Sequence, residues 1–80
     1  MTLRVADTDL AVTRTGDGDP LLLLTGLGGQ GRGWGDLIDR FAADFTTLVP
    51  DHPGTGGSGP PPEHSLEHHA LAMAEAIRQL

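Results

Sequence analysis

The sequence predicts an α/β fold in which a β-hairpin precedes a β-α-β unit, a long loop and a final helix. Two short apolar strands each run directly into a glycine-rich loop, at residues 26–33 and 51–63, and a segment with helical periodicity lies between them. Open α/β sheets bind ligands beyond the carboxyl ends of their strands. The two loops therefore also indicate a candidate site.

The first two strands are expected at residues 3–6 and 10–15, which are short and contain β-branched side chains. Residues 7–9, Asp-Thr-Asp, separate these segments and predict a hairpin turn. A second turn is predicted at residues 16–20, where glycine, aspartate and proline are concentrated.

The β-α-β unit follows this second turn. The continuous apolar run at residues 21–25 is typical of a strand buried on both faces. Residues 45–49 predict another strand, ended by Pro50, and a right-handed crossover makes the two strands parallel. The helix between them is indicated by apolar residues on one helical face, Trp34, Leu37, Ile38, Phe41 and Phe45.

A final helix is predicted after Ser65, which can cap its N-terminus. The helix carries an apolar stripe made of Leu66, Ala70, Met73, Ala74, Ile77 and Leu80. His64 and His68 have a spacing that can share a metal ion on a helix. Because His64 precedes the cap, we expect these two residues and His69 to form a solvated helix end, and we predict no metal site.

Composition limits the possible functions. The 80 residues carry a formal net charge of −6 and scattered arginines, which disfavours binding to nucleic acid or to anionic membranes. Cysteine is absent, so disulfides and thiolate metal sites are excluded. The N-terminal segment lacks the apolar stretch of a signal peptide, and we expect a cytoplasmic location.

Both loops resemble those of a known family. The run from Thr25 to Gly29 (Thr-Gly-Leu-Gly-Gly), Trp34, residues 49–58 (Val-Pro-Asp-His-Pro-Gly-Thr-Gly-Gly-Ser) and the Ser-Leu-Glu at residues 65–67 resemble the N-terminal part of α/β-hydrolases. Within that family the loops are most similar to aminoacrylate (carbamate) hydrolases of pyrimidine breakdown and to enol-lactonases. The resemblance implies an incomplete α/β-hydrolase sheet, with residues 1–80 forming a partial domain.

The resemblance also implies site residues. The backbone N–H of Leu27 is expected to be one donor of an oxyanion hole, and Gly26, Gly28 and Trp34 are expected to bind substrate. Thr25 stands where the family usually has His, and residues 52–53, His-Pro, replace the more usual x-Arg.

The resemblance further implies an ester, lactone, amide or carbamate as a small-molecule substrate, with no cofactor. We expect the nucleophile, acid and base to lie outside this chain. The isolated chain is then inactive, and it self-associates or needs the rest of the domain.

Other interpretations compete for the same residues. Ser58 nearly matches a nucleophile elbow, but it lacks the flanking strand and helix, so we reject it as nucleophile. Asp51 is expected to hydrogen-bond the loop backbone. Gly26, Gly28 and Gly31 also spell a dinucleotide-binding motif after a strand, although the helical period begins too late for it. A non-catalytic, hydrolase-like interaction module is the third possibility.

Overall fold

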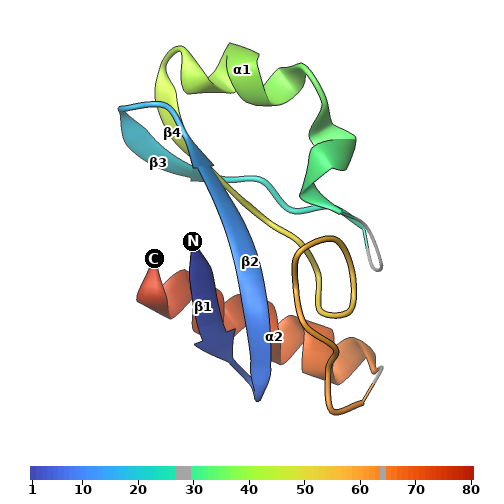
Figure 1. Ribbon diagram of the computed structural model, residues 1–80. Helices are drawn as coiled ribbons and strands as arrows, with labels where there is room; N and C mark the ends of the chain where they lie inside the picture. The colour runs from blue at the N-terminus through green and yellow to red at the C-terminus, as the bar shows by residue number, and fades with distance from the viewer. Residues whose placement is uncertain (27–29, 64) are drawn as a thin grey trace.

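The computed structural model describes residues 1–26, 30–63 and 65–80. In chain order its elements are β1 (Thr2–Val5), β2 (Thr8–Thr15), β3 (Asp19–Leu22), the 3-10 helix η1 (Gly31–Trp34), α1 (Leu37–Ala42), β4 (Phe45–Pro50) and α2 (Leu66–Gln79). The strands form one mixed sheet in the order β1-β2-β4-β3 (Figure 1), and the predicted parallel pairing is confirmed between β3 and β4. None of the described helices has the length and apolar character needed to cross a membrane.

β1 and β2 form the predicted antiparallel hairpin, but its turn consists of Ala6 and Asp7 rather than residues 7–9. Both turn residues have positive φ, 45° for Ala6 and 58° for Asp7, as a two-residue type I′ turn requires. Thr8 therefore belongs to β2, pairs with Val5 and is fully buried. The turn prediction was wrong because it rested on polarity, and Thr8 is a polar residue of the strand.

β3 lies at the edge of the sheet and begins earlier than the apolar run indicates. It starts at Asp19 and includes Pro20, whereas the sequence predicts a strand over residues 21–25. Proline is tolerated in edge strands because one side of such a strand has no ladder to complete. The chain stays close to the sheet until Leu23, whose N–H donates to the carbonyl oxygen of Leu48 at 3.0 Å. The expected burial on both faces is not found along the run, because of residues 21–25 only Leu23 is buried and Leu24 is 42% exposed.

The two α-helices cover opposite faces of the sheet. Neighbouring residues of a strand point to opposite faces, and β4 shows this clearly. Val49 lines a pocket together with Ile38 of α1, while Leu48 packs in the core cluster with Met73 of α2. The other buried members of that cluster come from the hairpin and α2, namely Val5, Leu10, Val12, Ala72 and Ala76. The main core therefore lies between the hairpin, β4 and α2.

The single helix predicted from Trp34 onward is not found, because Trp34 ends one helix and Leu37 begins another. Gly35 has a φ of 56° and separates η1 from α1, so Trp34 and Leu37 belong to different helices. Phe45, which the periodicity assigns to the same helical face, is the first residue of β4. Periodicity missed this division because a glycine can break a helix without changing the spacing of the apolar residues around it.

α2 begins at the predicted cap, because Ser65 Oγ accepts the N–H of His68 at 3.1 Å. The predicted apolar stripe, however, does not all face the sheet. Met73 is buried, whereas Leu66 and Ile77 are 69% and 54% exposed. The buried face of the helix instead consists of His68, His69, Ala72, Met73 and Ala76.

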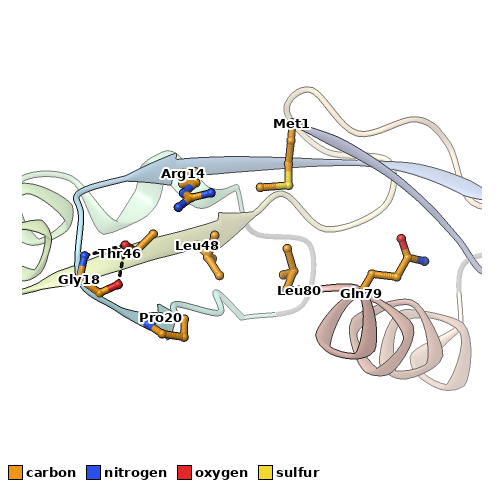
Figure 2. A pocket seen from close by; sticks show the side chains of 8 residues that line it. All are labelled: Met1, Arg14, Gly18, Pro20, Thr46, Leu48, Gln79 and Leu80. Atoms are coloured by element: carbon orange, nitrogen blue, oxygen red, sulfur yellow. Dashed lines mark hydrogen bonds between the residues drawn. The ribbon is translucent and has the colours of Figure 1, made fainter.

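The sheet face that α2 covers is open beyond the C-terminal end of the helix. A pocket of about 370 Å³ lies there (Figure 2), lined by Met1, Arg14, Gly18, Pro20, Thr46, Leu48, Gln79 and Leu80. A second pocket, of about 200 Å³, has an entirely apolar set of lining residues, Pro20, Leu22, Leu48, Ile77 and Leu80. The exposed part of the apolar stripe thus borders an uncovered part of the sheet.

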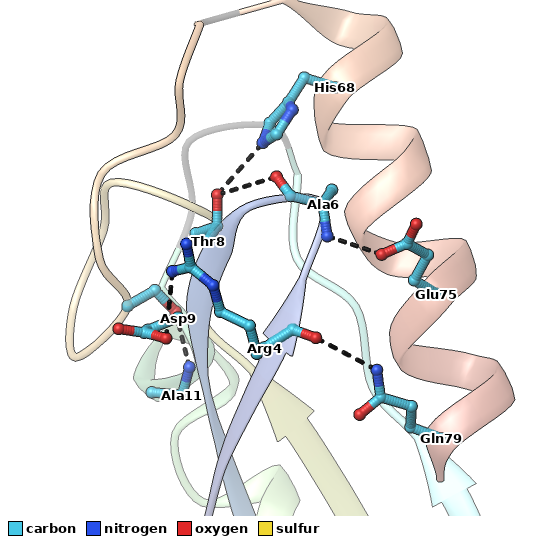
Figure 3. Close-up of polar contacts among 9 residues, drawn as sticks. Arg4, Ala6, Thr8, Asp9, Ala11, His68, Glu75 and Gln79 are labelled. Carbon is cyan, nitrogen blue, oxygen red and sulfur yellow. Dashed lines mark hydrogen bonds and ion pairs between the residues drawn. The ribbon is translucent and has the colours of Figure 1, made fainter.

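Polar side chains of α2 attach the helix to the hairpin (Figure 3). Glu75 accepts the N–H of Ala6 at 2.6 Å, which satisfies a backbone donor of the positive-φ turn. Gln79 donates to a carbonyl oxygen of β1 at 3.2 Å, and His68 Nε2 lies 3.3 Å from Thr8 Oγ1. These contacts favour a helix rotation in which this polar side meets the hairpin and part of the apolar stripe stays exposed.

Candidate functional site

The carboxyl ends of β3 and β4 lie side by side because the two strands are parallel neighbours. A pocket of about 420 Å³ opens beside the end of β3, lined by Leu24, Thr25, Gly26, Gln30, Gly33 and Trp34. Two of the predicted substrate-binding residues, Gly26 and Trp34, therefore line the same pocket. The predicted oxyanion-hole donor Leu27 and the predicted substrate-binding residue Gly28 lie outside the described residues.

Two polar groups in the lining of this pocket have no hydrogen-bond partner in the described part of the chain. They are the hydroxyl of Thr25 and the indole N–H of Trp34, and both atoms are shielded from solvent. Buried polar groups are nearly always hydrogen-bonded, so each exception calls for an explanation. A polar ligand or a further protein segment can complete the hydrogen bonds of these two groups, and His52 Nδ1 is a further such atom outside the pocket lining.

Asp51, the first residue after β4, connects the two loops. Its Oδ1 accepts the N–H of Gly31 at 2.6 Å, and its Oδ2 accepts the N–H of Gly57 at 2.9 Å. Its own N–H donates to the carbonyl oxygen of Ala11 in β2 at 2.9 Å. The predicted hydrogen bonding of Asp51 to the loop backbone is confirmed, and it extends to the first loop as well as the second.

His52 reaches the first loop from the second. Its Nε2 lies 3.0 Å from the carbonyl oxygen of Thr25, and the residue is only 7% exposed. In the sequence, residue 52 stands out only as part of a departure from the family pattern, so this contact was not predicted. The signal that was available is its position, directly after Asp51 at the end of a strand parallel to β3.

Ser58 is held in the second loop by backbone groups. Its Oγ donates to the carbonyl oxygen of Asp51 at 2.7 Å and accepts the N–H of Ala11 at 2.9 Å. One of these hydrogen bonds joins the loop to β2, and the other joins Ser58 to the start of its own loop. This geometry gives Ser58 a structural role and agrees with its rejection as a nucleophile.

The expected solvated helix end at His68 and His69 is wrong, because these residues are 7% and 6% exposed. The ring centroid of His69 lies 5.6 Å from that of His52 and 6.3 Å from that of His68. The first turn of α2 therefore packs against the second loop and the hairpin. Within residues 1–26, 30–63 and 65–80, no three His, Cys, Asp or Glu side chains are grouped to hold a metal ion. His64 lies outside these ranges.

The geometry does not favour the dinucleotide-binding alternative. In that motif a helix begins inside the glycine run and directs its N-terminus at the pyrophosphate. In the described part of this chain the first α-helix begins at Leu37, well after Gly31. Asp51, the candidate for a ribose hydroxyl, already accepts backbone N–H groups on both carboxylate oxygens.

Comparison with known proteins identifies relatives of the whole segment. The sequence profile of a family described as alpha/beta hydrolase fold matches residues 19–80. The chain is 38% identical over 66 residues to the protein named "Putative carbamate hydrolase RutD" of Pseudomonas syringae pv. syringae, covering 80% of this chain and 26% of the relative. It is 36% identical over 73 residues to pimeloyl-acyl-carrier-protein methyl ester esterase of Vibrio vulnificus, covering 91% of this chain and 26% of the relative.

A solved structure shows the same arrangement of elements. The crystal structure of an alpha/beta hydrolase from Sphaerobacter thermophilus matches with a TM-score of 0.86 at 31% identity, covering 99% of this chain and 31% of that one. The chain thus spans 26% of each of the two curated relatives and 31% of this structure.

Proposed function

The chain belongs to the α/β-hydrolase fold family, and from this premise we propose that it forms the N-terminal part of a longer serine-type hydrolase. The family resemblance and the fold class predicted from the sequence are confirmed. In the proposal, residues 1–80 are a partial domain, and the reaction is hydrolysis of an ester, lactone, amide or carbamate. The observation that carries the proposal is the pocket at the carboxyl end of β3, lined by Gly26 and Trp34.

The proposed chemistry places an oxyanion at the start of the first loop. Attack of a serine hydroxyl on the substrate carbonyl develops negative charge on its oxygen, and backbone N–H groups aimed at that oxygen lower the barrier. In hydrolases of this kind one such donor comes from the loop after the third strand, which here is Leu27. The serine and the His-Asp pair that activates it are proposed to lie outside this chain.

The pocket lining suits a small carbonyl compound. Trp34 presents an aromatic surface, and its indole N–H and the Thr25 hydroxyl, which have no partner among the described residues, supply a few polar groups. Such mixed linings are common in small-molecule sites. The named activities of the relatives make carbamates and methyl esters the first substrates to test.

The decisive variants change Leu27 in the protein expressed from its complete reading frame. Leu27→Pro removes the backbone N–H, whereas Leu27→Ala keeps it and serves as the matched control. We expect kcat for ester or carbamate hydrolysis to fall about 100- to 1000-fold in Leu27→Pro, as for loss of one oxyanion-hole donor. Circular dichroism and a denaturation midpoint establish that both variants are folded.

Two results would contradict the proposal. If the complete protein hydrolyses no ester, lactone, amide or carbamate and is not labelled by a serine-directed fluorophosphonate, a non-catalytic module is the better description. If Leu27→Pro and Leu27→Ala retain the same kcat, the oxyanion assignment is wrong. The cytoplasmic location stays a prediction, which cell fractionation tests.

A further inference from the structure

The second loop holds both walls of the candidate pocket. His52 contacts the carbonyl oxygen of Thr25, which lies on the wall that continues β3. Asp51 accepts the N–H of Gly31, the first residue of η1, whose last residue, Trp34, lies on the other wall. Two consecutive residues at the end of β4 thus hold the first loop at two points that lie on either side of residues 26–30.

The contact between His52 and Thr25 has a defined direction. A carbonyl oxygen can only accept a hydrogen bond, so His52 Nε2 must carry the hydrogen and donate it at 3.0 Å. The other ring nitrogen, Nδ1, is buried and has no partner among the described residues. The Thr25 contact is therefore the one hydrogen bond that these residues provide for the His52 ring.

The His52 side chain has little freedom to move elsewhere. It is 7% exposed, and the ring of His69 in the first turn of α2 lies 5.6 Å away, centroid to centroid. The adjacent carboxylate of Asp51 is held by backbone N–H groups of both loops. The position of His52 is consequently supported by the second loop and by α2, and neither of these segments contributes a residue to the pocket lining.

We propose that Asp51 and His52 are positioning residues that together form a clamp, holding the two walls of the pocket at a defined separation. The proposal deepens the proposed function and rests on it for the catalytic consequence alone. A small misplacement of groups that orient a substrate can lower a rate about 100-fold. Loss of the His52 donor is expected to affect the geometry of the pocket more than the stability of the fold.

His68 provides a matched control for this proposal. It is as buried as His52, at 7% exposure, and its Nε2 also meets a single oxygen at 3.3 Å, that of Thr8. That contact joins α2 to the hairpin and involves no residue of the pocket lining. A purely structural role for His52 predicts that replacing either histidine has the same kind of effect.

The experiment compares His52→Leu, His52→Gln and His68→Leu in the full protein. Glutamine supplies an amide N–H donor and leucine supplies none. The first readout is the indole N–H resonance of Trp34, assigned by its loss in Trp34→Phe. We expect it to shift in His52→Leu, to return towards the wild-type position in His52→Gln, and to stay in place in His68→Leu.

The second readout is kinetic. We expect His52→Leu to lower kcat about 10- to 100-fold with a smaller change in KM. His52→Gln should recover most of the lost kcat. His68→Leu should retain the wild-type kcat at temperatures below the unfolding midpoint of that variant. An unmoved Trp34 resonance in His52→Leu, or identical behaviour of His52→Leu and His52→Gln, overturns the proposal. If the Trp34 resonance shifts in His52→Leu but the wild-type protein has no hydrolase activity, the positioning role is supported and the proposed function is overturned.

A measurement on the wild type covers the case in which the variants do not fold. A long-range ¹H–¹⁵N spectrum of the imidazole groups identifies which nitrogen of His52 carries the hydrogen. The clamp requires hydrogen on Nε2, with a hydrogen bond to the Thr25 carbonyl. A ring protonated on Nδ1 alone would contradict it.

Discussion

At Gly31 the end of β4 and the adjoining Asp51 approach so closely that the position has no room for a side chain. An added Cβ would lie 2.6 Å from Val49 Cγ1 and 3.1 Å from Asp51 Oδ1. This close approach is what brings the Gly31 N–H within 2.6 Å of the carboxylate. Gly33, in the same 3-10 helix, has no atom within 4 Å of an added Cβ.

The contrast between these two glycines gives a matched test. We expect Gly31→Ala to lower the free energy of unfolding by about 1–3 kcal/mol, because the added methyl group overpacks the site. Gly33→Ala should change it by less than about 0.5 kcal/mol, as surface substitutions usually do. Denaturant titration of both variants measures the difference. Equal effects would show that Gly31 is not closely packed against Val49 and Asp51.

At the scale of the element, the start of α2 is set by a local contact, whereas its rotation about its own axis is set by contacts with residues distant in sequence. Its cap at Ser65 depends on residues within the first turn. Its rotation depends instead on contacts with the hairpin, made by His68, Glu75 and Gln79. The first turn therefore serves both purposes, since His68 donates its N–H to the cap and also faces Thr8.

The cap can be tested separately from the rest of the helix. We expect Ser65→Ala to lower the free energy of unfolding by about 1 kcal/mol, because the His68 N–H loses its acceptor. Ser65→Asp keeps an acceptor at the same place and should retain most of the stability. Denaturant titration and hydrogen exchange at the His68 amide report the change. If Ser65→Asp loses as much as Ser65→Ala, capping is not the reason for the loss.

At the scale of the whole molecule, the sheet is unfinished within these 80 residues. β3 pairs with β4 on one side and is the outermost strand of the described sheet. Parallel strands are normally covered on both faces, yet a set of apolar side chains borders open pockets here, namely Leu22, Leu48, Ile77 and Leu80. The relatives are three to four times longer, which supports the proposal that further elements of the domain cover this surface.

The uncovered surface predicts how the isolated chain behaves. We expect the 80-residue chain to self-associate, because contiguous apolar patches and unpaired strand edges favour association.

Ile77→Glu should reduce this association, since Ile77 is 54% exposed and lines the apolar pocket. Leu71→Glu is the matched control, because Leu71 is 49% exposed on α2 but lines none of the described pockets. Sedimentation velocity measures the association. A wild-type monomer with a sharp, cooperative thermal transition would contradict the prediction.

Sequence patterns predicted the order of the strands and α-helices, the parallel strand pair, the cap at Ser65 and the position of the pocket that Gly26 and Trp34 line. These features depend on local periodicity, turn chemistry and the topology of a β-α-β unit, all of which can be read within short windows. Periodicity and polarity do not reveal the Gly35 break or the hairpin turn at Ala6 and Asp7, because neither feature alters the pattern of apolar residues.

Only the folded structure shows which polar side chains are buried and which atoms they contact. His52 meets Thr25 across 27 positions of sequence, and His68 meets Thr8 across 60. A histidine in a loop or in the first turn of a helix is expected to be exposed unless a distant backbone or hydroxyl oxygen provides a partner. Such partners become neighbours only when the parallel strands and α2 are packed together, so the support of the pocket is a property of the folded chain.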